Sequence, residues 1–203
     1  ILCGRCAQAC QDGHQFIGAI DFLGTGSTTS RIGTFMDKPL VESVCTTCGQ
    51  CLSVCPTGAI EVKSPVKSIS RTVTTTCPYC GVGCQVDLLS KEDRLVGIQP
   101  AMDGPANEGA LCIKGQFAFD FVQHDDRLTK PLVRGDDGEL HEVDWNTALD
   151  RAAEGFRKVL EEHGRHAVYG VASGRAPNEA AYTMQKFIRA GFGTNQIDNC
   201  SRA

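Results

Sequence analysis

The most regular pattern of hydrophobic and polar positions lies in the last third of the chain. From Ala148 to Leu160, apolar residues recur at every third or fourth position, which predicts an amphipathic helix with one face packed in a core. Asp144 or Asn146 is expected to cap the start of this helix, and Gly164 lies near its end. The segment therefore predicts a helix that contributes to packing.

A strand and a second helix are predicted directly afterwards. Residues 167–172 form a short apolar run typical of a buried strand, 173–175 form a turn, and 178–190 form a helix. This order indicates the opening of a parallel sheet. Such a turn can present backbone N–H groups to a dinucleotide phosphate, although the glycine pattern of dinucleotide-binding folds is incomplete here.

The front half carries shorter patterns. Residues 86–89 and 95–99 are mostly apolar and flank the polar stretch 90–94, which predicts a β-hairpin. Residues 63–70 read K-S-P-V-K-S-I-S, with turn residues and no apolar period. We therefore predict a linker at 63–72.

Composition and charge exclude several classes of protein. The 203 residues suit one large domain or two to three small ones. The net charge is −4 with scattered lysines and arginines, so no nucleic-acid-binding surface is indicated. No apolar run approaches the roughly 20 residues of a membrane-spanning helix, and the start lacks a signal-peptide pattern. We expect a cytoplasmic protein without a membrane span.

The cysteines point to a specific chemistry. Eleven of the twelve fall before residue 113 in three bunches, which favours metal ligands over disulfide bridges. Residues 45–56 read C-T-T-C-G-Q-C-L-S-V-C-P, the run of bacterial [4Fe–4S] ferredoxins, whose fourth cysteine serves a neighbouring cluster. Zinc sites are usually built from two separated Cys-x2-Cys pairs, so iron–sulfur is favoured over zinc.

The fourth cysteine requires a partner run, and C-G-R-C-A-Q-A-C at 3–10 provides it. Exchange of fourth ligands between the runs predicts two cluster sites. One site takes Cys45, Cys48, Cys51 and Cys10, and the other takes Cys3, Cys6 and Cys55. The spacing puts the missing thiolate of the second site immediately before Ile1, which we favour over a three-iron cluster.

Other features of this region bear on the same prediction. Residues 18–22 echo residues 58–62, which indicates two related halves. Gln11 stands where ferredoxins usually have proline, and the stretch 23–44 is longer than in small ferredoxins.

A further group of cysteines surrounds the predicted hairpin. It has the spacing Cys-x2-Cys-x3-Cys, and a fourth cysteine follows the hairpin. The four residues are Cys77, Cys80, Cys84 and Cys112. They predict a third [4Fe–4S] site, for which zinc is a stronger rival than at the ferredoxin-type runs.

The motifs around this third site resemble a known family. C-P-Y-C-G-V-G-C at 77–84, C-I-K-G-Q-F-A-F-D at 112–120 and D-R-L-T-K-P-L-V-R at 126–134 resemble the N-terminal [4Fe–4S] domain of molybdenum or tungsten bis-pyranopterin guanine dinucleotide oxidoreductases. With a two-cluster domain before it, the chain most resembles the catalytic subunit of a formate dehydrogenase.

The resemblance implies an α+β, multi-domain organisation. A two-cluster ferredoxin-like domain at 1–62 and the linker at 63–72 come first. A small β-rich [4Fe–4S] domain at 73–129 and the start of an α/β molybdopterin oxidoreductase domain at 130–203 follow.

Several residue roles also follow from the resemblance. Lys114 occupies the place of a lysine that lies between cluster and pterin, and an ammonium there can stabilise added negative charge. Arg175 and Asn178 are expected to contact the pterin cofactor. Cys200 lies four positions before the cysteine or selenocysteine that binds molybdenum or tungsten, so we expect Cys200 itself to be a buried structural thiol. That ligand would follow Ala203, and selenocysteine is one hypothesis because its codon is normally read as stop.

The implied reaction is the oxidation of formate to CO2, or its reverse, at a molybdenum or tungsten bis(molybdopterin guanine dinucleotide). Two electrons would pass by Lys114 to three [4Fe–4S] clusters and then to a partner subunit of flavoprotein (NAD), ferredoxin or hydrogenase type. Three alternatives remain at this stage: a nitrate reductase-like enzyme, an electron-transfer subunit resembling the large iron–sulfur subunit of complex I, and a zinc-stabilised interaction module.

The remaining polar residues suggest no further site. Neither the histidines nor the acidic residues have ligand spacing, so we expect them on the surface or satisfied in the core. They are His14, His124, His141, His163 and His166, with the acidic residues 125, 126, 136 and 137.

Overall fold

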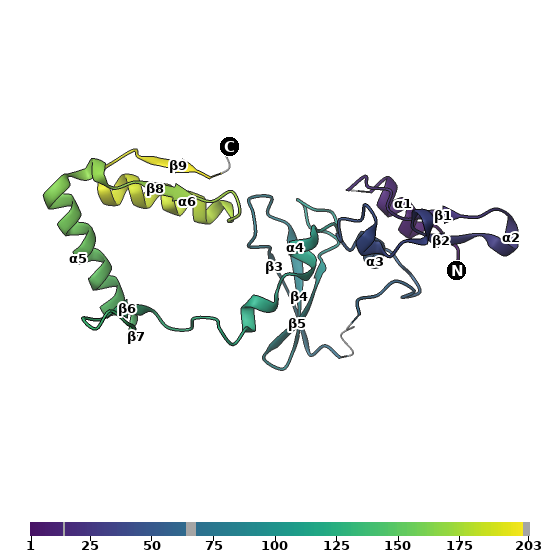
Figure 1. Ribbon diagram of the computed structural model, residues 1–203, viewed down its shortest axis with the longest axis horizontal. Helices are drawn as coiled ribbons and strands as arrows, with labels where there is room; N and C mark the ends of the chain where they lie inside the picture. The colour runs from purple at the N-terminus through teal and green to yellow at the C-terminus, as the bar shows by residue number, and fades with distance from the viewer. Residues whose placement is uncertain (14, 64–67, 201–203) are drawn as a thin grey trace. The chain divides into compact units, whose positions relative to one another are not determined.

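The computed structural model describes residues 1–13, 15–63 and 68–200 (Figure 1). The chain forms two compact units, residues 1–123 and 124–203. Within these residues each sheet has two or three strands, and helices and strands are mixed.

Two short helices organise the first cysteine runs. α1 (Arg5–Gln11) and α3 (Gln50–Ser53) contact one another, and each begins directly after a glycine in the left-handed conformation. These glycines are Gly4, with φ +73°, and Gly49, with φ +77°. Each lies between the first and second cysteines of a Cys-x2-Cys pair, so the two halves of the predicted repeat share a local backbone.

The long stretch between the two runs forms its own hairpin. β1 (Asp21–Leu23) pairs antiparallel with β2 (Arg31–Gly33), and α2 (Gly26–Thr29) closes the turn between them. Two 3-10 turns follow, η1 (Phe35–Asp37) and η2 (Leu40–Glu42).

The second part of this unit is an antiparallel sheet of three strands in sequence order. β3 (Arg71–Thr76) pairs with β4 (Gln85–Lys91), which pairs with β5 (Arg94–Pro100). The predicted hairpin is confirmed, with a turn of two residues. α4 (Ile113–Phe117) contacts β5, and η3 (Asp120–Gln123) ends the unit (Figure 1).

The end of the predicted linker is wrong. Arg71 and Thr72 belong to β3, because their backbones pair with Ser90 and Leu89 of β4. Residues 64–67 of the linker lie outside the described residues. The other domain boundaries stay predictions.

Asn107 holds the loop that connects β5 to α4. Its side chain is buried, accepts a hydrogen bond from the Gln85 N–H at 2.7 Å, and donates to the carbonyls of Gln85 at 3.1 Å and Ala110 at 2.9 Å. The Asn107 side chain thereby provides hydrogen-bond partners for backbone groups that strand pairing does not reach, and it orders the loop that leads to Cys112.

The second unit begins with a small hairpin and a long helix. β6 (Leu132–Arg134) pairs antiparallel with β7 (Leu140–Glu142), and α5 (Trp145–His163) follows. The Asp144 carboxylate accepts hydrogen bonds from the Thr147 hydroxyl and from the Thr147 and Asn146 N–H groups. These bonds, that of the hydroxyl first, lower its pKa. Gly164 ends the helix with φ +76°.

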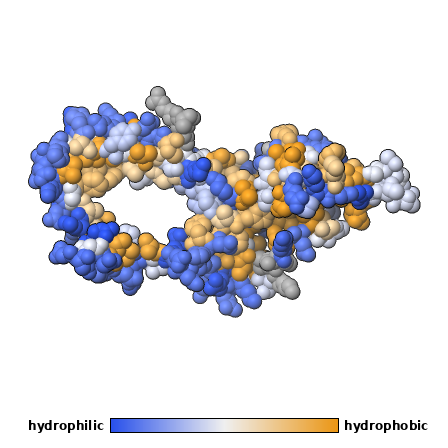
Figure 2. Space-filling view, viewed as in Figure 1, coloured by the Kyte–Doolittle hydropathy of each residue, from blue (hydrophilic) through white to orange (hydrophobic). Residues whose placement is uncertain are grey.

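The predicted burial of the α5 apolar face is wrong for this chain. No α5 residue is buried, and Trp145, Leu149 and Phe156 are exposed, so hydrophobic surface remains visible on the second unit (Figure 2). The reason is that few elements pack against the helix here. Phe156 contacts Phe192 with ring centroids 4.9 Å apart.

The last elements form the predicted opening of a parallel sheet. After the 3-10 turn η4 (Arg165–Ala167), β8 (Gly170–Ala172) pairs in parallel with β9 (Ile197–Asn199). The connection between the strands is α6 (Asn178–Lys186) and the π-helical turn η5 (Phe187–Gly191). The order of strand, turn and helix is confirmed, although the strand is shorter than its apolar run.

Candidate iron–sulfur and cofactor sites

The structure brings together the four cysteines predicted for the first cluster site. Cys10, Cys45, Cys48 and Cys51 line one cavity. The pKa of the Cys51 thiol is raised to about 11, first by burial and then by the neighbouring thiols of Cys48, Cys45 and Cys10. Cys10 comes from α1 and the others from the loop before α3 and α3 itself, so the predicted exchange between the runs has a structural basis.

The second predicted set also shares a cavity. Cys3, Cys6 and Cys55 line a space of about 520 Å³, to which Cys51 also contributes. Hydrogen bonds from backbone N–H groups, Thr57 first, lower the pKa of Cys55 to about 7. Proximity of donors to a thiolate is the arrangement that tunes iron–sulfur centres.

The long stretch between the runs covers this second cavity. Ile32, Thr34 and Lys38 line it together with Leu40, so the β1–β2 hairpin and the turns after it form one wall. The sequence showed only that this stretch is longer than in small ferredoxins. Its placement over the cysteines was not predicted, because no local pattern links residues 31–40 to Cys55.

The third set surrounds the start of the three-stranded sheet. The Cys77 N–H donates to the Cys84 carbonyl at 2.8 Å. Burial raises the pKa of the Cys77 and Cys84 thiols, and the nearby thiols of Cys80 and Cys112 raise both pKa values as well. Cys77 packs with Val86 and Leu111 in a hydrophobic core, which shields this side of the site from water.

Backbone donors also reach sulfur in the first set. The Ala19 N–H donates to Cys10 Sγ at 3.1 Å, and the Thr47 N–H donates to Cys45 Sγ at 3.3 Å. Such donors stabilise thiolate, which is the form that binds iron. All twelve cysteines are described and none is in a disulfide. Among the described residues, no three side chains converge as ligands of a single metal ion.

Lys114 lies beside the third set. It is half-buried on α4, two residues after Cys112, and its charge acts on the Cys77 thiol. Its ammonium nitrogen is 5.5 Å from the centroid of the Tyr79 ring, a cation–π distance.

Tyr79 lies beside this site, and its position there was not predicted from the sequence. Its hydroxyl donates to the Ala118 carbonyl, and its ring meets Phe121 edge to face with centroids 6.1 Å apart. These contacts fix the ring under the Lys114 ammonium. Its position inside the Cys77–Cys84 motif was the only available signal, and that motif does not reveal which side chain faces the lysine.

The predicted pterin contacts lie at one edge of the parallel pair. Arg175 and Asn178 are exposed and follow the carboxyl end of β8, where the Arg175 N–H donates to Ser173 Oγ at 3.1 Å. Because β9 is parallel, its carboxyl end meets the same edge. Open α/β sheets bind ligands at this edge, so the loop fits an anionic cofactor, while the two contacts stay predictions.

Cys200 is exposed, and its predicted burial is wrong. It directly follows β9, and its Sγ lies 3.4 Å from the Gly174 nitrogen and 3.6 Å from Ser173 Oγ. The thiol therefore contacts the loop after β8 at the edge of the sheet and is not in a core. The position proposed for the metal ligand lies outside the described residues.

The four described histidines and the four acidic turn residues are exposed, as predicted. His141, for example, pairs with Asp137 at 2.8 Å. His14 lies outside the described residues. No helix in the described part of the chain combines the length and the apolar character that crossing a membrane requires.

Comparison with known families gives three matches in series. Residues 1–59 match the 4Fe-4S dicluster domain, 70–124 match the Molybdopterin oxidoreductase Fe4S4 domain, and 127–203 match Molybdopterin oxidoreductase. A ferredoxin-like domain, an Fe4S4 domain and the start of a molybdopterin oxidoreductase domain therefore follow one another.

Curated relatives cover the whole chain. Proteins named "Putative formate dehydrogenase" from Staphylococcus aureus (strain USA300) and Staphylococcus haemolyticus (strain JCSC1435) are each 36% identical over an alignment that spans 100% of this chain. The alignment spans 24% of each relative, so the chain covers about a quarter of their length.

Proposed function

Because the chain belongs to the molybdopterin oxidoreductase family, as a formate dehydrogenase-like member, we propose that it is the electron-relay part of a formate dehydrogenase. The observation that carries this proposal is the gathering of eleven cysteines into three sets within one compact unit. A unit that begins a parallel α/β sheet follows them in the same chain.

Each set of cysteines would hold one [4Fe–4S] cluster, and a cluster supplies one-electron redox chemistry. The loop after β8 would hold the molybdopterin cofactor through Arg175 and Asn178. The metal–pterin centre supplies the two-electron oxidation of formate to CO2 when it is bound. The protein provides positioning and electrostatics for both kinds of group.

The chain's own residues do three things in this scheme. The core around Cys77 keeps water from one side of the third site. Backbone N–H groups at Ala19, Thr47 and Thr57 favour charged sulfur. The Lys114 ammonium, held over Tyr79, favours the arrival of an electron near Cys77 because it stabilises negative charge.

The finer parts of the proposal concern the holoenzyme. They are three clusters, a bis(guanine dinucleotide) form of the cofactor, molybdenum or tungsten, a selenocysteine or cysteine ligand, a cytoplasmic location under anaerobic conditions, and a redox partner subunit. The cysteine sets support the clusters, and the other parts rest on the family resemblance of the motifs.

The holoenzyme that contains this chain, purified without oxygen, is expected to oxidise formate with a viologen dye as acceptor. It should contain about twelve irons for this relay, together with molybdenum or tungsten. Nitrate reduction in place of formate oxidation would favour the nitrate reductase-like alternative. Iron without molybdenum or tungsten would favour an electron-transfer subunit, and a colourless zinc protein would contradict the relay altogether.

Replacement of Lys114 by methionine is expected to lower the reduction potential of the third site by roughly 40 mV, which corresponds to about 1 kcal/mol for a one-electron couple. The reason is that the added electron loses a nearby positive charge. A redox titration followed by electron paramagnetic resonance (EPR) measures the potential. Lys114→Arg keeps the charge and should retain most of it, whereas equal potentials in Lys114→Met and the parent would contradict the role.

Tyr79 offers a matched pair of variants for the same measurement. Tyr79→Phe keeps the ring under the ammonium and should leave the potential close to that of the parent, whereas Tyr79→Leu removes the ring and should shift it toward the Lys114→Met value.

A further inference from the structure

Gly49 is the point where the first cysteine runs touch the helix of the third site. It lies between Cys48 and Cys51 in the sequence. A Cβ placed on Gly49 would be 2.9 Å from Gln116 Cγ and 3.4 Å from Phe117 Cζ. Distances this short mean that the Gln116 side chain rests directly against the Gly49 backbone, with no room for another side chain.

Gln116 is fixed at this contact by two hydrogen bonds. Its side chain is only 5% exposed, and its Nε2 donates to the Ile98 carbonyl of β5 at 2.8 Å. Its backbone N–H donates to the Cys112 carbonyl at 3.0 Å. A short path of covalent bonds, one van der Waals contact and one hydrogen bond thus connects Cys48 with Cys112.

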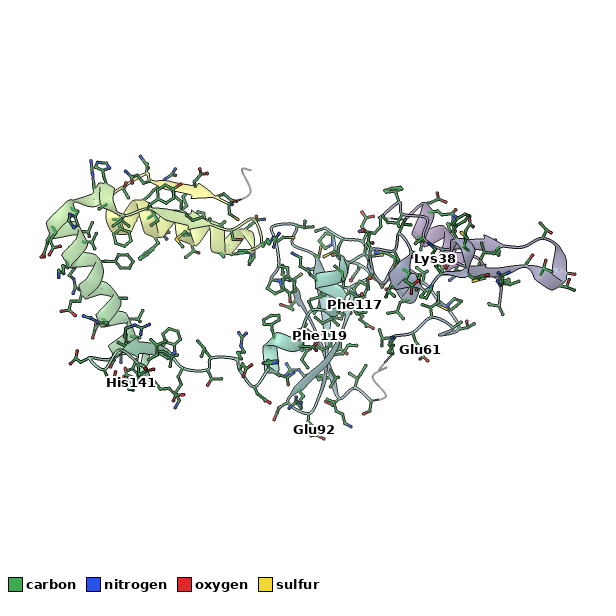
Figure 3. The ribbon with its side chains drawn as sticks, in the orientation of Figure 1. Lys38, Glu61, Glu92, Phe117, Phe119 and His141 are labelled. Carbon is green, nitrogen blue, oxygen red and sulfur yellow. The ribbon has the colours of Figure 1, made fainter. Side chains whose placement is uncertain are left out.

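The surrounding interface is loosely packed. A cavity of about 720 Å³ opens beside Gln116, with walls from α3 and the segment after it, from β4 and β5, and from α4. Glu61, Phe117 and Phe119, which line this cavity, are labelled in Figure 3.

We infer that the Gly49–Gln116 contact is the bridge by which an electron passes between the Cys77, Cys80, Cys84, Cys112 site and the Cys10, Cys45, Cys48, Cys51 site. The inference rests on the proposed relay. One electron leaves the site that contains Cys77, which is oxidised by one unit. The site that contains Cys48 is reduced by one unit, and no proton is transferred. Gln116 is a positioning residue in this scheme, and glycine is needed at position 49 for close approach.

The test is the rate at which an electron moves between the two sites, measured by freeze-quench EPR after partial photoreduction of the holoenzyme. In the parent, the signals of the two reduced sites should reach their equilibrium ratio in the earliest samples. Gln116→Ala opens a gap at the contact and should slow the approach to this ratio, while Gln116→Met fills the same space with an unbranched chain and should keep it fast. Gly49→Ala should slow it as well, because its Cβ meets the Gln116 side chain.

Two controls keep the outcomes separate. Gly26 has the same φ of +77° as Gly49, but a Cβ there meets nothing within 4 Å, so Gly26→Ala introduces the same backbone strain without the contact and should keep the parent rate. Iron content is measured for every variant. Full iron with an unchanged rate in Gln116→Ala and Gly49→Ala overturns the bridge, whereas absence of iron–sulfur signals in the parent overturns the relay itself.

Discussion

Cys10→Ala and Cys48→Ala are each expected to lose about four irons, and the double variant should lose the same four. The reason is that Cys10 lies with the second run in space, where it lines one cavity with Cys45, Cys48 and Cys51 and acts on the Cys51 thiol. The iron losses from replacing two ligands of one cluster are not additive, because the loss of the first ligand already releases the cluster. Iron analysis with EPR of the reduced holoenzyme measures the effect.

Cys6→Ala supplies the matched comparison. Cys6 belongs to the same run as Cys10 but lines the other cavity, with Cys3 and Cys55. The double variant Cys6→Ala with Cys10→Ala should therefore lose about eight irons. If this pair loses only four and the Cys10 and Cys48 pair loses eight, each run holds its own cluster and the exchange of ligands is wrong.

Asn107→Ala is expected to lower the free energy of unfolding by about 3 kcal/mol, because it leaves the Gln85 N–H and the Ala110 carbonyl without their hydrogen bonds to this side chain. The Gln85 carbonyl also loses its bond to Asn107 Nδ2 but keeps the one from the Ala101 N–H at 3.2 Å. Since the loop leads into Cys112, weaker retention of iron at the third site should accompany the loss. Urea unfolding followed by circular dichroism, at matched iron content, measures the stability.

Asn146→Ala is the control for this substitution. Asn146 is exposed on the first turn of α5, so the same change of residue type should alter stability by no more than about 0.5 kcal/mol. Asn107→Asp keeps the shape but turns a carboxylate oxygen toward two carbonyls, and it should be as destabilising as alanine. A stability of Asn107→Ala equal to that of the parent would show that the loop does not depend on this side chain.

Local structure followed closely from the sequence. A helix cap at Asp144 or Asn146, the Gly164 stop and the β4–β5 hairpin were all predicted, because each depends on residues a few positions apart, and the structure has Asp144 as the cap. The parallel pairing of β8 and β9 was also indicated, since a strand, turn and helix in that order favour a returning parallel strand.

Burial was predicted less well. The apolar stripe on α5 indicates that one face of the helix favours burial, but it does not indicate which element covers that face. In this chain Trp145 and Leu149 are exposed. The burial of Cys200 was also predicted wrongly. A thiol is often buried, yet its position after an edge strand leaves this one exposed beside Ser173.

The sequence alone predicted which cysteines form sets, because the spacing within each run and the known exchange of fourth ligands restrict the choices. Only the tertiary structure placed Tyr79 under Lys114, Asn107 inside its loop and Gly49 against Gln116. These contacts join residues far apart in the chain. The spacing of residues along the chain predicts local structure and ligand motifs. A contact between distant segments depends on how whole helices and strands pack, and no local sequence pattern contains that information.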